Sequence, residues 1–359
     1  MIEKRENVYF NYLKGIAAIS IVLFHYNKLT DTLHNNELFP FYNILEIAYV
    51  KGGNLVEFFF MLSGVLFFMN YEKRLVDGAI SGKAFFLRRI MKLYPLYLIT
   101  TAVTFVLQII HYSTNGFFFD HVRESIFFNC KYLLLNIIGI SSQWFSAREP
   151  YPINSPAWYL SVSFFVYILF AVLCRTVKND ILRRTICFAL SIIGYILIVK
   201  NISFPFLNID MGRGISCFFI GGMSYLIWNQ VHQRKNKPLS ILIMSASVFI
   251  FISSCLFNNL YLVMLIRYIS VIIFCLTLNT FVSWNCRLLN ELGKISFSIY
   301  LWQFPYMCAI KILIRNIDIF YTKIFFVLFW SVLLVLSILS YVFIENRFKN
   351  TMRSKNRKP

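Results

Sequence analysis

Long apolar stretches recur along almost the whole chain, separated by short polar connections. A transmembrane helix needs about 20 mainly apolar residues to cross a hydrocarbon core about 30 Å thick. Ten stretches are long enough, which predicts an all-α polytopic membrane protein with about ten transmembrane helices. The predicted spans are residues 8–26, 53–69, 93–111, 157–174, 185–199, 212–229, 239–257, 260–283, 294–313 and 322–344.

An eleventh apolar stretch, at about residues 125–140, is interrupted by Asn129, Lys131 and Asn136. Basic residues favour the cytoplasmic side of a membrane. With ten spans and an N-terminus inside, most of the 35 Lys and Arg residues lie on that side, whereas an eleventh crossing would move every later basic loop outside. We therefore expect a re-entrant or interfacial helix at 125–140, within an outer segment of residues 112–156.

The composition supports this interpretation. Of the 359 residues, 58% are hydrophobic and 14% are charged, which excludes a soluble protein of ordinary composition. The net charge of +19 is spread over short loops, so it indicates membrane orientation and not a nucleic-acid partner. The eight Cys residues lie mostly in apolar stretches without a paired C-x-x-C, so no metal site is predicted. We expect one membrane domain over residues 1–359, with a basic tail at 349–359 and both termini cytoplasmic.

Two ionisable residues, Lys14 and His25, lie within the first apolar stretch. Their spacing corresponds to about three helical turns and about 16 Å, which places both on one helix face. Ionisable residues inside a membrane are rare and usually functional, so the pair indicates a functional path across the bilayer. The structural alternative is that Lys14 reaches the headgroups and His25 ends the helix.

Glu57 lies near the start of the second span among three Phe residues, and Arg213 opens a later span. A carboxylate in hydrocarbon needs a partner or a proton, and the nearest candidates by depth are His25 and Arg213. Glu57 is therefore predicted either to orient His25 or to form a structural ion pair between helices. Arg213 is a candidate partner for Glu57 or for an anionic acceptor.

A basic patch formed by Arg88, Arg89 and Lys92 precedes the third span. Spacings of three and four residues place these side chains on one helix face. Because guanidinium groups bind phosphate through a planar fork of donors, the patch is a candidate for binding coenzyme phosphates. The alternative is that it orients the chain and contacts acidic lipids.

Polar residues also occur near the end of the chain. Ser296 and Tyr300 lie in a stretch rich in hydroxyl and aromatic side chains, in which Pro305 is expected to kink the helix and free backbone carbonyls. Glu345 closes the last span beside Arg347.

Together these segments resemble the membrane-bound acyltransferase-3 family over about residues 9–348. The family's first-helix pattern of a basic residue, ten residues and a His is met by Lys14 and His25. Its acidic residue before F-F-x-x-S-G is met at residues 57–64, and its R-R-x-x-R-x-x-P motif at residues 88–95, with Lys in place of the third Arg. Weaker matches are W-x-L-S at Trp158–Ser161, L-G-x-x-S-x-S-x-Y-L at Leu292–Leu301 and I-E-x-x-F at Ile344–Phe348.

The resemblance implies an O-acyltransferase that moves acetyl from cytoplasmic acetyl-CoA to a hydroxyl of a surface or exported glycan, free or lipid-linked. His25 would be a general base or a transient acyl carrier, Lys14 would stabilise charge near the thioester, and the basic patch would hold coenzyme phosphates. We expect such a protein in a bacterial cytoplasmic (inner) membrane, in contact with its lipids. The remaining candidates for contact with the acceptor, or for structural roles, are Arg213, Trp158, Ser296, Tyr300 and Glu345.

Two positions depart from the family pattern. Ser163 stands where many members have Glu, and Gln303 stands where many have His, so neither is expected to carry essential proton transfer. A transporter or flippase for a lipid-linked glycan is the main alternative function, because buried Arg and Glu residues also suit the movement of an anionic lipid. A glycan polymerase is a third possibility. No inverted repeat is visible, and the basic patch is confined to one side.

Overall fold

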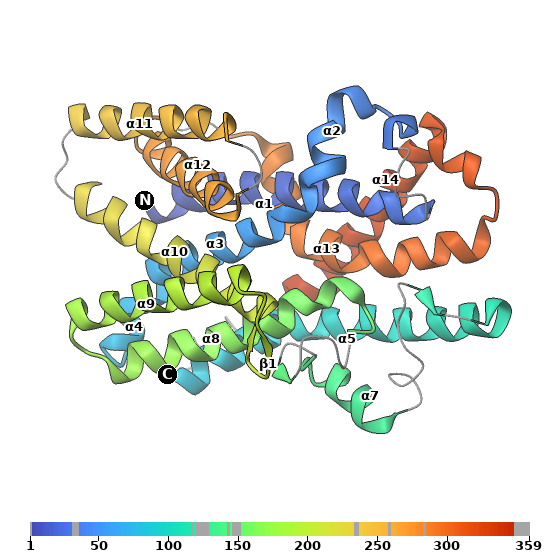
Figure 1. Ribbon diagram of the computed structural model, residues 1–359, viewed down its shortest axis with the longest axis horizontal. Coiled ribbons are helices and arrows are strands. Elements are labelled where there is room, and N and C mark those ends of the chain that lie inside the picture. Colours follow the sequence, from blue (N-terminus) through green and yellow to red (C-terminus); the bar gives the residue numbers. More distant parts are fainter. Residues whose placement is uncertain are drawn as a thin grey trace.

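The computed structural model of the chain is built almost entirely from helices that lie side by side along its longest axis (Figure 1). The structure describes residues 2–30, 36–116, 118–119, 129–141, 144–145, 152–232, 237–257, 260–282 and 285–347. The predicted basic tail, residues 349–359, lies outside the described residues. A two-residue antiparallel pair, β1 (Ser203–Phe204) with β2 (Leu207–Asn208), forms a small hairpin. The α-helices are α1 (Ile2–Tyr26), α2 (Tyr42–Lys51), α3 (Leu55–Phe67), α4 (Lys73–Val76), α5 (Gly82–Asn115), α7 (Cys130–Ile137), α8 (Trp158–Thr176), α9 (Asp180–Val199), α10 (Ile209–His232), α11 (Lys237–Cys255), α12 (Tyr261–Phe281), α13 (Arg287–Leu313) and α14 (Lys323–Ser340).

Eight segments among the described residues are long and apolar enough to cross a membrane. They contain α1, α3, α5, α8, α9, α11, α12 and α14, and each coincides with a predicted span. The other two predicted spans are α10 and α13, with 24 and 27 residues. These two helices are less apolar because they pack inside the bundle and carry small and polar side chains towards other helices. The prediction of an all-α polytopic membrane protein is confirmed.

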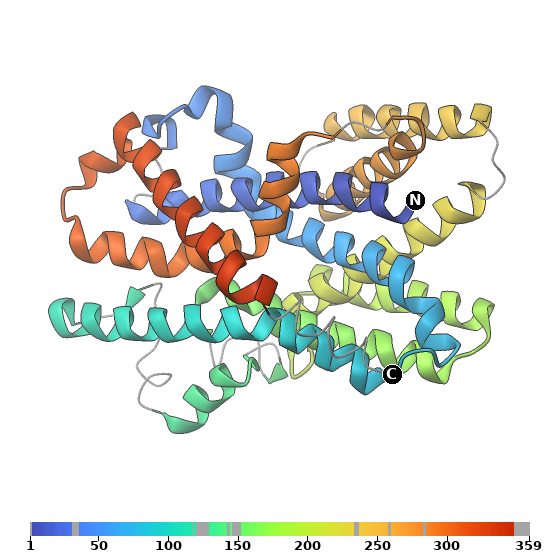
Figure 2. The ribbon, with the colours of Figure 1, turned by 180° about the vertical axis from the view of Figure 1, so that it is seen from behind.

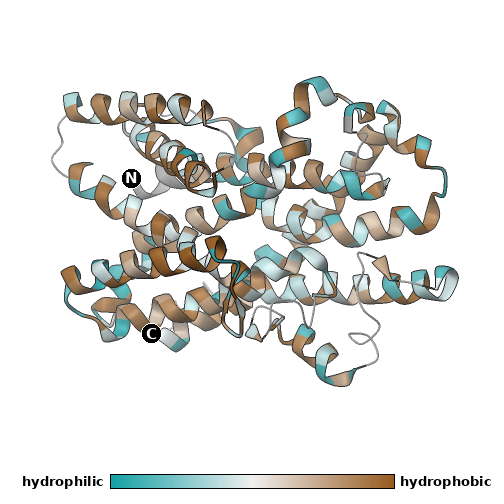
Figure 3. Ribbon diagram, viewed as in Figure 1, coloured by the Kyte–Doolittle hydropathy of each residue, from teal (hydrophilic) through white to brown (hydrophobic). Residues whose placement is uncertain are grey.

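Hydrophobic residues are distributed as a membrane protein requires. They predominate along α11 and α12 (Figure 3), and many large apolar side chains of α11 are exposed on the outside of the bundle. In water such a surface would be costly, but lipid chains solvate it without penalty.

The segment between α5 and α8 does not contain a further crossing in its described part. Its helix, α7, has eight residues, which corresponds to about 12 Å and is less than half of the hydrocarbon thickness. It is shorter than the predicted 125–140, and residues 125–128 lie outside the described residues. Asn136 ties α7 to the chain entering α8, because its Oδ1 accepts a hydrogen bond from the Ile153 backbone N–H at 2.9 Å.

Two pairs of helices approach so closely that only glycine fits between them. A Cβ on Gly293 of α13 would lie 2.0 Å from the backbone oxygen of Asn11 in α1, and one on Gly64 of α3 would lie 1.9 Å from that of Phe218 in α10. Asn11 also donates a side-chain hydrogen bond to Asn290 at 2.8 Å. Seen from behind, α14 crosses the bundle obliquely towards α5 (Figure 2), and its continuation at Tyr341–Glu345 contacts α5.

We expect Gly293→Ala to destabilise the protein by about 1–3 kcal/mol, the usual cost of overpacking, because the new methyl group would force α13 away from α1. Thermal unfolding in detergent measures this loss. Gly82→Ala is the control, because a Cβ at Gly82 meets nothing within 4 Å. Equal unfolding temperatures for the two variants would show that the contact is not tight.

Candidate active site

Lys14 and His25 share one face of α1, as their spacing predicts, and this face is turned towards α13. The two residues nevertheless line two different cavities. Lys14 lines a large cavity of about 1020 Å³ together with Gly293 and Ser296 of α13. His25 lines a small cavity of about 40 Å³ together with Gln303 of α13. The first turns of α1 and α13 lie at the same end of the bundle as Arg89. We call this end of the bundle the basic end.

The large cavity lies at the upper limit of the roughly 300–1,000 Å³ that is typical of small-molecule and cofactor sites. Its walls come from α1, α3, α4, α5, α8 and α13, and from two π-helical turns, Phe68–Glu72 and Tyr341–Glu345. Such turns occur frequently at functional sites. Two acidic residues, Asp77 and Glu345, line it. The six basic residues that line it are Lys14, Lys73, Arg74, Arg89, Lys92 and Lys294.

Arg89 is held in the wall of the large cavity by aromatic rings. Its guanidinium carbon lies 4.5 Å from the ring centre of Tyr71 and 4.6 Å from that of Phe67. These cation–π contacts fix the plane of the group, and they leave its edge, where the N–H donors are, for other partners. The buried Nε of Arg89 has no hydrogen-bond partner in the described part of the chain. The Arg89 guanidinium therefore keeps at least one hydrogen-bond donor that no described residue uses.

The basic patch predicted from the sequence divides in the structure. Arg89 and Lys92, three residues apart, both line the large cavity, whereas Arg88 is not one of its lining residues. Side chains of consecutive helical residues point about 100° apart, so only one of two neighbouring arginines faces the cavity. Lys73 and Arg74 are further basic residues of this cavity that the motif did not reveal.

The inner part of the large cavity is lined by hydroxyl groups. The Ser63 and Tyr159 hydroxyls lie 3.3 Å apart, and Ser296 donates to the backbone oxygen of Gly293 at 2.9 Å. Glu345 is buried and accepts a hydrogen bond from Ser298 at 2.5 Å. The predicted candidates Ser296 and Glu345 therefore belong to the same cavity as Lys14.

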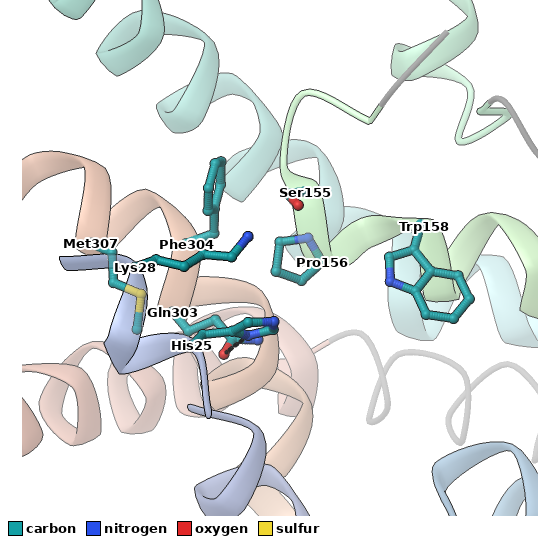
Figure 4. Close-up of a pocket in the computed structure, with 8 residues that line it drawn as sticks. All are labelled: His25, Lys28, Ser155, Pro156, Trp158, Gln303, Phe304 and Met307. Carbon is teal, nitrogen blue, oxygen red and sulfur yellow. Dashed lines mark hydrogen bonds between the residues drawn. The ribbon is translucent and has the colours of Figure 1, made fainter. Parts of the chain in front are cut away.

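The small cavity is centred on His25, whose ring lies beside Gln303, while Lys28 extends across towards Pro156 and Ser155 (Figure 4). The Nδ1 atom of His25 is 2.9 Å from Oε1 of Gln303. Trp158, Phe304 and Met307 complete the lining.

Tyr300 connects the walls of the two cavities. It lines the large cavity, and its hydroxyl donates to the backbone oxygen of Pro156, a lining residue of the small one, at 2.8 Å. Tyr300 is 4% exposed, and we call its contact with Pro156 the partition between the two cavities. The predicted candidates Tyr300 and Trp158 line different cavities, Tyr300 the large one and Trp158 the small one.

Of the two roles predicted for Glu57, the hydrogen bonds favour the structural ion pair with Arg213 over the orientation of His25. Glu57 is 3% exposed, and its Oε1 accepts from Arg213 Nε at 2.7 Å, while the His25 ring is held by Gln303. Arg213 also binds Asp210 at 3.1 Å, and its guanidinium lies 4.4 Å from the ring centre of Trp158. Glu57 pairs with Arg213 because a permanent cation stabilises a buried carboxylate more than an imidazole does. Glu57 is therefore connected to the small cavity by its contact with Arg213, which in turn lies against Trp158.

These positions can be compared with known proteins. The acyltransferase-3 family model, described as an acyltransferase domain, matches residues 7–345, nearly the whole chain. The protein belongs to the acyltransferase-3 family. It is therefore a membrane acyltransferase, as the motifs around Lys14 and His25 indicate. No curated protein and no solved structure matches this acyltransferase in the corresponding searches.

Sequence reasoning underestimated Gln303. As a departure from the family pattern it was expected to have no essential part in proton transfer, and its amide indeed carries no titratable proton at neutral pH. The structure nevertheless makes it the partner of His25. The available signal was a polar side chain in the middle of an apolar stretch, two residues before Pro305.

We expect Arg213→Met to cost about 3–5 kcal/mol of stability, because it leaves the buried Glu57 carboxylate without its cation. Unfolding in detergent measures the loss. The double variant Glu57→Gln/Arg213→Met should recover most of it, because no buried charge then remains unpaired. A double variant that is less stable than Arg213→Met would contradict a pairing role for Glu57.

Proposed function

We propose that this protein is an O-acetyltransferase that transfers acetyl from acetyl-CoA to a hydroxyl of a cell-surface or exported glycan. Membership of the acyltransferase-3 family supports the reaction class. The observation that carries the proposal for the donor is the large cavity, in which six basic residues and only two acidic ones surround a space of cofactor size.

The basic residues of the large cavity suit the phosphates of coenzyme A. Arg89 offers the donors at the edge of a guanidinium whose faces are occupied by aromatic rings, and Lys92, Lys73 and Arg74 add positive charge around it. Lys14 lies in the same cavity, where its charge would stabilise the thiolate that leaves the thioester. Arg88, outside this lining, fits the alternative role of chain orientation and contact with acidic lipids.

The small cavity suits the acceptor. The acceptor hydroxyl loses its proton to His25 as its oxygen attacks the acetyl carbonyl, the carbon–sulfur bond breaks, and the proton passes on to the coenzyme A thiolate. Alternatively, His25 first takes the acetyl group on a ring nitrogen and passes it to the hydroxyl in a second step. The two routes need the same imidazole, and the residues around it are compatible with both.

The direction of transfer follows from the charge distribution. Basic residues favour the cytoplasmic side, so the basic end and both termini would face the cytoplasm, where acetyl-CoA is made, in a bacterial inner membrane. His25 would then face the side of exported, lipid-linked or surface glycans. A transporter or flippase for a lipid-linked glycan, the alternative from the sequence, has no comparable support once the family is known.

We expect His25→Ala to abolish transfer of radiolabelled acetyl from acetyl-CoA to membrane glycans, because no other imidazole lines either cavity in the described part of the chain. The variant should still insert and fold. Ile16→Ala is the matched control on the exposed side of the same helix and should retain activity. Normal acetylation by a well-expressed His25→Ala protein would refute the proposed mechanism.

We expect Arg89→Ala to raise the KM for acetyl-CoA by about tenfold or more, the equivalent of one charge-assisted hydrogen bond of about 1.5–3 kcal/mol. Arg88→Ala is the matched control, because its side chain lies outside the cavity lining, and its KM should stay close to that of the wild type. Initial rates at varied acetyl-CoA concentration measure both. Equal effects of the two substitutions would show that the patch acts through general charge and not as a binding site.

A further inference from the structure

The side chain of Gln303 can take only one orientation. Gln303 is fully buried, at 0% exposure, and its Nε2 donates a hydrogen bond to the backbone oxygen of Tyr300 at 2.9 Å. A flipped amide would place its own oxygen against this carbonyl oxygen, and two acceptors repel each other. The hydrogen bond to Tyr300 therefore decides that Oε1, and not the amide nitrogen, faces His25.

This orientation dictates where His25 carries its proton. Oε1 of Gln303 only accepts hydrogen bonds, and it lies 2.9 Å from Nδ1 of His25. Nδ1 must then be the N–H donor, and in the neutral ring the lone pair must be on Nε2. We propose that Gln303 is a positioning residue that fixes His25 in the Nδ1-protonated tautomer and so presents Nε2 to the reacting groups. This inference rests on the proposed function of His25.

Among the described residues, no Asp or Glu lines the small cavity. Besides the imidazole of His25, its ionisable lining residue in this part of the chain is Lys28. Behind Trp158 lie Arg213 and Glu57, which are bound to each other. A neutral amide therefore does the orienting, without the negative charge that a carboxylate partner would place beside the imidazolium.

Both proposed routes use the Nε2 lone pair. When Nε2 takes the proton of the acceptor hydroxyl, the ring becomes an imidazolium whose Nδ1–H still donates to Gln303, and the proton leaves from Nε2 to the thiolate. When Nε2 takes the acetyl group instead, one carbon–nitrogen bond forms as the carbon–sulfur bond breaks, and the Nδ1–H bond to Gln303 again persists. In the second step the acceptor oxygen attacks the acetyl carbon, the carbon–nitrogen bond breaks to restore the Nε2 lone pair, and the hydroxyl proton passes to the coenzyme A thiolate. The amide is unchanged at every stage, so it neither supplies nor consumes a proton.

Substitutions at position 303 test the inference by kinetics. We expect Gln303→Met, which keeps the length of the side chain but accepts no comparable hydrogen bond, to lower kcat by about 10²–10⁴-fold, since loss of a tautomer-fixing partner has effects of this size in other enzymes. The KM for acetyl-CoA should stay unchanged, because the donor cavity does not include Gln303. An unchanged kcat, or a loss that lies only in KM, would overturn the inference.

Gln303→Glu provides the conservative counterpart. A carboxylate can still accept from Nδ1, although its second oxygen cannot donate to the Tyr300 carbonyl as the amide does. The loss of kcat should therefore be at least about tenfold smaller than in Gln303→Met. The carboxylate charge would hold the imidazolium proton more tightly, so the acid side of the pH–activity profile should move to higher pH. A Gln303→Glu variant as inactive as Gln303→Met, although equally well folded by size exclusion and equally able to bind acetyl-CoA, would contradict the assignment.

A spectroscopic readout separates this inference from the proposed function. In protein labelled with ¹⁵N-histidine, the His25 signals are identified by their absence from His25→Ala, and their shifts report which ring nitrogen carries the proton. We expect protonation at Nδ1 in the wild type and at Nε2 in Gln303→Met. A wild-type ring protonated only at Nε2 would overturn the inference, whereas full activity of His25→Ala would instead overturn the proposed function.

Discussion

Helices α1 and α13 approach each other so closely at Asn11 and Gly293 that their backbones are in direct contact. This contact fixes the register of the two helices, and the register decides which side chains meet further along. Ten residues further along α13, a distance of about 15 Å, the same register places Gln303 beside His25, and near the contact it places Ser296 in the cavity of Lys14. A small shift of α13 would therefore disturb both cavities at once, since side chains at the two ends are carried by the same pair of helices.

Buried arginines need a partner in the low dielectric of the membrane, and the kind of partner distinguishes two groups. Arg213 and Arg183 each have a carboxylate partner, Glu57 and Glu72 respectively, so each of these guanidinium groups is paired within the protein. Arg89 is held by aromatic faces instead, and its buried Nε has no hydrogen-bond partner among the described residues. A guanidinium left in this state has donors to offer to a ligand. The division is consistent with structural roles for the paired arginines and with a binding role for Arg89.

Features that depend on a single helix could be predicted from the sequence. Contacts that depend on the packing of two helices were harder to predict. The common face of Lys14 and His25 follows from helical periodicity alone, and the eight apolar membrane-crossing segments of the described residues follow from hydropathy. The partner of Glu57 was narrowed to two residues by depth, but the choice depended on the packing of α3 against α10. The role of Gln303 was missed for the same reason, because it depends on the register of α13 against α1. Likewise, the sequence does not show on which side of α5 the cavity lies. The position of the cavity decides that Arg89 lines it and Arg88 does not.

The partition at Tyr300 lies between the cavity of Lys14 and the cavity of His25. Under the proposed function, acetyl has to pass from the first cavity to the second. The bond that orients Gln303 is made to the backbone carbonyl of Tyr300 and not to its side chain. Rotation of the Tyr300 ring can therefore open the partition while Gln303 still holds His25. Tyr300 would thus contribute its hydroxyl to the boundary between thioester and acceptor, and its backbone carbonyl to the orientation of the imidazole.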